Sequence, residues 1–245
     1  MATQFHLNVG QLTDVGRQRE NNEDNMASII PGNAEIAAKK GALFVVADGM
    51  GGHARGEVAS KIAVETMPNS YYQNASEEIT TALQQAVQQA NAAILAAGSG
   101  MGTTCVAAVL QGNTLFIANV GDSRVYIIRH GEVKQVSEDH SVVAEQMRAG
   151  LLTKEQVREH PARNMITRAL GEKGDVEVDT FSALIQEGDL LVLCTDGLWE
   201  FVSDEEIGNI VQQSGPEESV KRLIERANEQ GGTDNITAIV VQVLA

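Results

Sequence analysis

Hydrophobic residues along the chain fall into short apolar runs that are separated by turn residues. The runs are rich in Val, Ile, Leu and Ala, and their length is typical of strands. They predict strands at Ala42–Ala47, Thr104–Leu110, Thr114–Val120, Arg124–Arg129, Leu190–Thr195 and Ile236–Val243. Turn signals at Asn113 and Gly131 predict hairpins, and hairpins join strands that run antiparallel.

A second pattern places apolar residues three or four positions apart and predicts helices. Within residues 76–96 it lines one helical face with Ile79, Leu83, Ala86, Ala90 and Ile94. We expect Ser76 to be the N-cap of this helix, because its hydroxyl can accept from the first free backbone N–H groups.

Three further helices are expected. Residues 56–67 predict an amphipathic helix whose buried side holds Val58, Ala59, Ile62 and Ala63. Ser203 and Glu206 form a capping-box pattern, and Pro216 opens a last helix that stops before the Gly231-Gly232 pair.

Helices and strands come in blocks rather than in strict alternation, and this arrangement predicts an α+β fold. The chain has no Pro-, Gly- or Ser-rich linker and no internal repeat, so we expect residues 1–245 to form one domain. The polar stretch 141–164 contains a further capping-box pair, Thr153 and Gln156, and is expected to be a small helical insertion over the surface.

The net charge of the chain limits the classes of binding partner that we expect. The 18 Lys and Arg residues against 33 Asp and Glu residues give a formal net charge of −15. Such a surface repels phosphate backbones and anionic lipids, so we expect neither nucleic acid nor membrane as a partner. No apolar run has the length of a membrane span and no secretory signal opens the chain, so we expect a cytoplasmic protein.

The two cysteines, Cys105 and Cys194, both lie within apolar runs that are predicted strands. We expect two reduced, buried thiols rather than a disulfide or a catalytic nucleophile. Gln111 and Glu200 stand six positions after them, where cysteine-dependent phosphatases need an arginine, so that class is excluded.

Acidic residues follow or precede the apolar strands. Asp48 and Asp196 end predicted strands, Asp122 follows one, Asp234 precedes another, and Glu23-Asp24 precedes residues 26–30. If these ends meet, the carboxylates repel one another unless a cation neutralises them, and all-oxygen ligands favour Mg²⁺ or Mn²⁺ over Zn²⁺. Two such ions would activate a water for attack at phosphorus. The alternative interpretation is that each Asp-Gly is only a turn.

Two basic candidates accompany the acids. Arg19 lies near Asp24 and offers a guanidinium that can bind a phosphoryl group, although Arg17 competes for this role and is expected on the same face of a strand. His53 follows the glycine-rich segment 48–52 at a predicted helix start, where it can act as a general acid. We expect structural or surface roles for the other histidines, His6, His130, His140 and His160.

Taken in order, these motifs resemble the metal-dependent protein phosphatases of the protein phosphatase 2C family, in its compact bacterial-type branch. The resemblance covers almost the whole chain and rests on segments Arg19–Asn25, Val46–His53, Met101–Thr104, Asn119–Arg124, Asp139–Ser141, Thr195–Gly197 and Gly232–Asn235. It implies a four-layer αββα sandwich, in which two antiparallel sheets are flanked by helices on both faces. It also implies that 141–164 is a mobile flap beside the cleft.

The resemblance further implies a centre of two Mn²⁺ or Mg²⁺ ions and a possible third. In that arrangement Asp48 bridges the two ions, the Gly49 carbonyl binds the second, and Asp196 and Asp234 complete the shell of the first. Glu23 and Asp24 act near the second ion, and Asp122 with Asp196 matches the third site. Arg19 matches the phosphate-binding arginine. The general acid is His53 or a metal-bound water.

The expected function is therefore hydrolysis of phosphoserine and phosphothreonine in proteins by a metal-activated water, without a phosphoenzyme. Its partners would be phosphoproteins made by Ser/Thr kinases, and we expect a monomer. Two alternatives stay open: a catalytically inactive phosphoprotein-binding regulator of the same fold, and a phosphatase of sigma-regulatory phosphoproteins. The first is expected to lack metal carboxylates, and the second the arginine motif and the flap.

Overall fold

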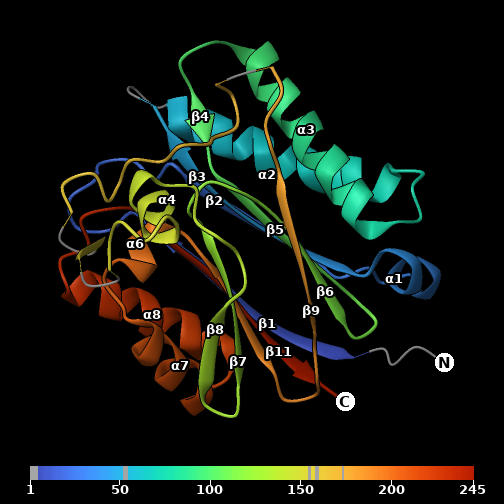
Figure 1. Ribbon diagram of the computed structural model, residues 1–245. Coiled ribbons are helices and arrows are strands. Elements are labelled where there is room, and N and C mark those ends of the chain that lie inside the picture. The colour runs from blue at the N-terminus through green and yellow to red at the C-terminus, as the bar shows by residue number, and fades with distance from the viewer. Residues whose placement is uncertain (1–4, 52–54, 154–155, 158–159, 173) are drawn as a thin grey trace.

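The computed structural model describes residues 5–51, 55–153, 156–157, 160–172 and 174–245. Its strands form two sheets in which every pairing is antiparallel (Figure 1). The first sheet has the order β1 (His6–Asp14), β11 (Ile236–Leu244), β10 (Leu190–Cys194), β7 (Arg124–Arg129) and β8 (Glu132–Gln135). The second has the order β2 (Asp24–Ile29), β3 (Ala42–Met50), β5 (Cys105–Gln111), β6 (Thr114–Val120) and β9 (Asp179–Leu184), with β4 (Gly102–Thr103) also paired to β3.

Helices cover the outer face of each sheet (Figure 1). The β2–β9 sheet carries α2 (Arg55–Gln73) and α3 (Ile79–Ala97), and the β1–β8 sheet carries α7 (Asp204–Gln213) and α8 (Pro216–Glu229). Three short helices complete the set within the described residues: α1 (Ala34–Lys40), α4 (Val142–Arg148) and α6 (Asp196–Trp199). The predicted four-layer αββα sandwich is thus confirmed. No helix among the described residues is long and apolar enough to cross a membrane.

The layers explain why the strands read as continuous apolar runs. Successive side chains of a strand point to opposite faces of its sheet, and here both faces are covered. In β3, Leu43 and Val45 pack under the helices, whereas Phe44 and Val46 fill the space between the two sheets. Each fully buried aliphatic side chain of this kind contributes about 1.5–3 kcal/mol to folding.

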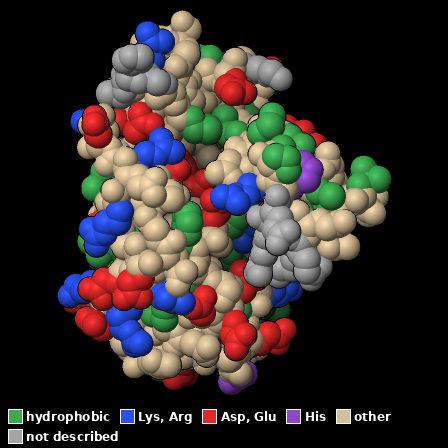
Figure 2. Space-filling model, turned by 90° about the vertical axis from the view of Figure 1, so that its left-hand side faces the viewer, with side chains coloured by type: hydrophobic (Ala, Val, Ile, Leu, Met, Phe, Trp, Pro, Cys, Tyr) green, Lys and Arg blue, Asp and Glu red, His purple; other side chains and the backbone are tan. Residues whose placement is uncertain are grey.

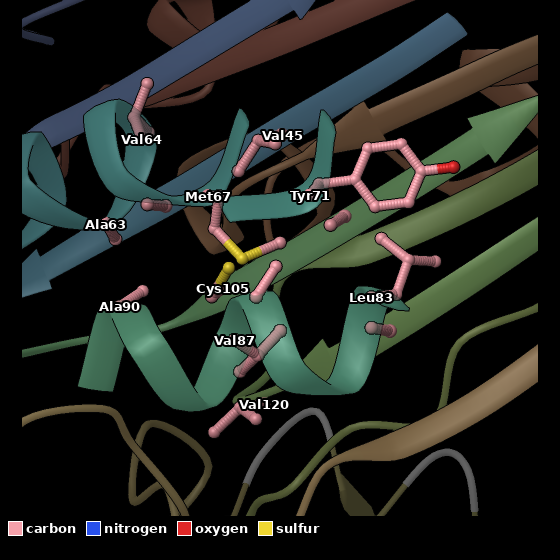
Figure 3. Close-up of a cluster of buried hydrophobic side chains, with 14 of the residues drawn as sticks. Val45, Ala63, Val64, Met67, Tyr71, Leu83, Val87, Ala90, Cys105 and Val120 are labelled. Carbon is pink, nitrogen blue, oxygen red and sulfur yellow. The ribbon is translucent and has the colours of Figure 1, made fainter. Parts of the chain in front are cut away.

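Helices α2 and α3 lie on their sheet through small and medium-sized side chains. Figure 3 shows Met67 of α2 and Val87 of α3 pointing toward Cys105 of β5, and all three are fully buried. Tyr71 closes one end of the cluster and donates its hydroxyl to the carbonyl of Lys40, 2.6 Å away. This packing fixes α2 on the sheet, and with it the start of α2 beside the end of β3.

The strand predictions are confirmed, with small shifts at the ends. The predicted runs at Thr114–Val120 and Arg124–Arg129 match β6 and β7. Strand β3 continues to Met50, so Asp48 lies inside the strand rather than at its end. Strand β10 stops at Cys194, one residue before the predicted end.

The helix predictions need three corrections. Helix α3 begins at Ile79 with Glu78 as its N-cap; Ser76 instead accepts from the Glu78 N–H in the preceding turn. Helix α2 runs on to Gln73 although Pro68 lies inside it. Val58, expected on the buried side of α2, is 45% exposed. The capping box of Ser203 and Glu206 is confirmed at the start of α7.

The segment 141–164 folds back on itself beside the sandwich. Ser141 caps α4 through the Ala144 N–H and also forms an isolated bridge with Ile166, which brings the two ends of the segment together. The pairing of Thr153 with Gln156 is confirmed, because each side chain accepts from the other's backbone N–H.

Candidate metal centre

Carboxylates from four separate segments converge at one end of the sandwich. Strands β2 and β3 place Asp24 directly opposite Asp48. In the other sheet, β10 ends just before Asp196, and β11 begins just after Asp234. A hydrogen bond from Thr195 Oγ1 to Asp24 Oδ2, 2.9 Å long, joins the two sheets at this end. Figure 2 shows acidic side chains inside a hollow on this side of the molecule, with Lys and Arg side chains at its edge.

Asp24 is buried, with 5% of its surface exposed. Burial raises its pKa to about 7, and the negative charges of Asp196 and Asp234 act in the same direction. Hydrogen bonds from Thr237 and Thr195 oppose the rise, because they stabilise the ionised carboxylate. Asp24 therefore sits where a positive charge is needed to keep it ionised.

Burial and neighbouring negative charges also raise the pKa values of Asp48 and Asp196. Burial raises the pKa of Asp48 well above its usual value, and the charges of Asp24, Asp196 and Asp122 add to the rise. Burial followed by the charge of Asp234 raises the pKa of Asp196 to about 6. The Oδ1 atom of Asp196 is buried without a hydrogen-bond partner. A buried carboxylate oxygen without a partner destabilises the fold, and a bound cation would give this oxygen a partner.

Asp122 lies in the turn between β6 and β7 and is 3% exposed. Burial raises its pKa well above the usual value, and the charges of Asp196 and Asp139 contribute further. The Arg124 guanidinium acts against this rise. The sequence-predicted third site, made of Asp122 and Asp196, thus brings together two acids that each destabilise the other's charge.

Arg19 lies at the edge of the acidic group. Its Nη2 donates to Asp234 Oδ2 at 2.8 Å, and its side chain is 52% exposed. Arg17 lies elsewhere: it lines a surface hollow of about 270 Å³ with Glu225, Asn228 and Glu229. The expectation that both arginines share one face of a strand is wrong, because β1 ends at Asp14 and residues 16–18 form a turn.

Glu23 and Gly49 mark the place where β2, β3 and α2 meet. The Gly49 N–H donates to the Glu23 carbonyl at 3.1 Å, and Ser60 Oγ donates to the same carbonyl at 2.6 Å. A Cβ on Gly49 would lie 2.2 Å from the Gly56 carbonyl oxygen, so only glycine fits. Burial raises the pKa of Glu23, against the Arg19 charge and a hydrogen bond from the Gly56 N–H.

The donor set fits a hard divalent cation. All the candidate side chains are carboxylates, and the unpartnered Asp196 oxygen together with the raised pKa values calls for positive charge. In the described part of the chain, no three His, Cys, Asp or Glu side chains are placed so that they could hold a metal ion by themselves. The predicted ligand set also includes the backbone carbonyl of Gly49.

Several residues of this site were given no role by the sequence prediction. Thr195, Thr237 and Thr104 are fully or almost fully buried hydroxyls at the same end of the sheets, and Thr104 Oγ1 accepts from the Asp48 N–H. Glu200, just after α6, has a pKa raised to about 7 by burial and by Asp196. Arg163 of the 141–164 segment has its Nε 3.8 Å from Glu200 Oε1. A polar residue inside an apolar run was the available signal for the threonines.

The predicted histidine roles divide into two cases. His53 lies outside the described residues. His140 is buried, accepts from the Gly121 N–H at 3.1 Å through Nδ1, and pairs with Asp179 through Nε2 at 3.0 Å. Its structural role is therefore confirmed.

Known phosphatases are similar to this chain over most of its length. Residues 17–240 match the family model described as protein phosphatase 2C. The serine/threonine phosphatase stp of Listeria innocua is 41% identical over 241 residues, which cover 94% of this chain and 93% of that protein.

Two solved structures are similar over nearly the whole chain. The serine/threonine phosphatase of S. agalactiae superposes with a TM-score of 0.88 at 35% identity, covering 97% of this chain and all of that one. The catalytic domain of the serine/threonine protein phosphatase PstP, in complex with two manganese ions, superposes with a TM-score of 0.84 at 36% identity, covering 98% and 99%.

Proposed function

The chain belongs to the protein phosphatase 2C family and is a phosphoprotein phosphatase, and we propose that it hydrolyses phosphoserine and phosphothreonine with the help of Mn²⁺ or Mg²⁺. The observation that carries the metal dependence is the buried Oδ1 of Asp196, which has no partner inside a group of acids that raise one another's pKa. The two manganese ions of the PstP complex support the same proposal.

The ligands of the proposed centre are those that the resemblance to the family implies. Asp48 would be a ligand of both ions, the Gly49 carbonyl a ligand of the second, and Asp196 and Asp234 ligands of the first. Glu23 and Asp24 would assist near the second ion, and Asp122 with Asp196 would hold a third. Bound ions would supply the positive charge that these carboxylates need and would lower the pKa of a water positioned for attack at phosphorus.

The chain's own residues have three tasks in this proposal. Arg19, half exposed and in reach of Asp234, would bind the phosphoryl oxygens with its guanidinium. Thr195 would hold Asp24 in one orientation through its hydroxyl. Residues 141–164 would form a flap beside the cleft and contact the phosphoprotein.

No side-chain nucleophile is part of the proposal, and no phosphoenzyme forms. Both cysteines are fully buried, and burial raises the pKa of Cys105 to about 12 and that of Cys194 further. A thiol with such a pKa is protonated and inert at neutral pH. The proposed general acid is His53.

We further propose that residues 1–245 act as one domain, as a monomer in the cytoplasm, on the products of Ser/Thr kinases. An inactive phosphoprotein-binding regulator is disfavoured because all the predicted acids are present. A phosphatase of sigma-regulatory phosphoproteins is disfavoured by the presence of Arg19 and of the 141–164 segment.

Phosphate release from a phosphothreonine peptide tests the proposal. The protein is treated with chelator, the chelator is removed, and Mn²⁺ is titrated back. We expect turnover to be absent without metal and to return with Mn²⁺, and we expect Asp196→Asn to stay inactive at every metal concentration. A folded wild-type protein that never turns over the peptide would favour the regulator.

A further inference from the structure

Asp122 and Asp196 lie just beyond the same end of one strand pair. Strands β7 and β10 are antiparallel, and their last matched residues at this end are Arg124 and Cys194. Asp122 comes two residues before Arg124, and Asp196 comes two residues after Cys194. Because both acids lie outside the strand ladder, strand hydrogen bonds do not fix their separation.

The side chain of Trp199 joins these two segments. Trp199 ends α6, the short helix that Asp196 begins, and its Nε1–H donates to the backbone carbonyl of Asp122 at 3.0 Å. Helix positions three apart lie on the same side of a helix. The helix that carries Asp196 is therefore tied to the backbone of Asp122 by a single side-chain hydrogen bond.

Arg124 holds the Trp199 ring in place. Its guanidinium carbon lies 3.5 Å from the centroid of the indole, in the geometry of a cation–π contact. The guanidinium itself is anchored: Nε and Nη2 donate to the Asp139 carboxylate at 2.6–3.1 Å, and Nη1 donates to the Tyr126 hydroxyl at 3.0 Å. With its side chain only 16% exposed, Arg124 has little freedom to move.

We propose that Trp199, stacked on the anchored Arg124, is a positioning residue that sets the separation of Asp122 and Asp196 and thereby the affinity of the metal site that these two acids form. The inference rests on the proposed function, because it assumes that this pair holds a metal ion. It assigns Trp199 no contact with substrate. This ion would have two carboxylate ligands, fewer than the first ion, and we infer that it is the weakest-bound. Its affinity is the one most affected, because Asp122 is a ligand of no other ion, whereas Asp48 and Asp234 do not depend on this hydrogen bond.

Trp199→Phe tests the proposal, because phenylalanine keeps one aromatic ring to pack over Arg124 but has no N–H donor and lacks the second ring of the indole. A hydrogen bond of this kind is worth about 1 kcal/mol, which corresponds to about a fivefold change in a dissociation constant. Isothermal titration with Mn²⁺ should therefore show a roughly fivefold weaker affinity for the weakest ion. The affinities of the tighter ions should change less, because Asp122 is a ligand of neither of them.

Tyr126→Phe is the matched control. It removes one polar group from the same cluster, the hydroxyl that accepts from Arg124, and leaves the bond from Trp199 to Asp122 intact. We expect its Mn²⁺ titration to match the wild type, even where its melting temperature falls. Equal weakening of Mn²⁺ binding in both variants, or no weakening in Trp199→Phe, would overturn the proposal.

Wild-type fluorescence gives an independent reading, because Trp199 is the one tryptophan of the chain. Addition of Mn²⁺ should change its emission with the midpoint of the weakest calorimetric site. Emission that follows the tighter ions instead would contradict the assignment. Turnover of a phosphothreonine peptide by the same samples separates the two ideas: a wild type without metal-dependent turnover refutes the proposed function, whereas active protein with unchanged Trp199→Phe binding refutes only this inference.

Discussion

Without bound metal, the folded protein should be less stable at pH 8 than at pH 5. Asp24 has an ordinary pKa of 3.8 that is raised to about 7 in the folded protein, and Asp196 is raised to about 6. Between the ordinary pKa of 3.8 and the raised pKa values, the native state holds protons that the unfolded chain has released. Each rise in pH within this interval therefore favours unfolding. Stability is present in full at low pH and is lost as the pH rises through the folded pKa values.

The size of the effect follows from Asp24 alone. Between pH 5 and its folded pKa lie about two pKa units, and at about 1.4 kcal/mol per unit this is a loss of about 3 kcal/mol. For a chain of 245 residues, that loss corresponds to a fall in Tm of about 5–10 °C. Asp179 does not contribute, because hydrogen bonds from His140 and Arg168 hold its pKa below the usual value despite burial and it is ionised throughout this range.

Differential scanning calorimetry in chelator at pH 5, 6, 7 and 8 measures this slope. The same series in excess Mn²⁺ should lose it, because the bound cations keep the carboxylates ionised. Asp24→Asn is the control: a neutral amide that can still accept from Thr195 should flatten the slope without metal. A chelated wild type that is as stable at pH 8 as at pH 5 would refute the reasoning.

Three further predictions use single substitutions. Asp196→Asn should abolish turnover while the Tm without metal rises or stays equal, because the change removes a ligand and relieves repulsion; calorimetry and phosphate release check both. Gly49→Ala should destabilise the fold by about 3 kcal/mol or more, since its Cβ would lie 2.2 Å from the Gly56 carbonyl oxygen, and urea unfolding should show the loss. Arg19→Ala should lower kcat/KM for a phosphopeptide by about 100-fold through the lost charged hydrogen bonds, whereas Arg17→Ala should not; an equal loss in both would contradict the assignment of Arg19.

The layers of the fold were predictable because both faces of most strands are buried. Such strands appear as continuous apolar runs, and the turns between them carry glycine or asparagine. Strands β1, β2, β4, β8 and β9 were not among the predicted strands. In β1, Gly10 interrupts the apolar pattern, and its packing against α8 explains it. A Cβ on Gly10 would lie 2.2 Å from the backbone of Pro216, so the glycine serves a contact that is distant in sequence.

The acids of the site were predictable for a different reason. Asp48, Asp122 and Asp196 each stand next to a glycine at or near the end of an apolar run. A charged residue at such a place does not contribute to the hydrophobic core, so it stands out in the sequence. What the sequence does not reveal is which groups surround them. Thr237 lies within an apolar strand, and Glu200 follows a tryptophan, and neither carries a local pattern that links it to residues far away in the chain.

The most direct test of the proposed metal-dependent activity measures metal binding and turnover on the same samples. Chelator-treated protein is dialysed to equilibrium against increasing Mn²⁺, and each sample is assayed for bound metal and for phosphate release from a phosphothreonine peptide. We expect turnover to be absent in metal-free protein and to appear as two ions bind. We expect Asp48→Asn to bind fewer ions and to stay inactive. Turnover that persists without bound metal, or full Mn²⁺ binding by Asp48→Asn, would contradict the proposed metal dependence.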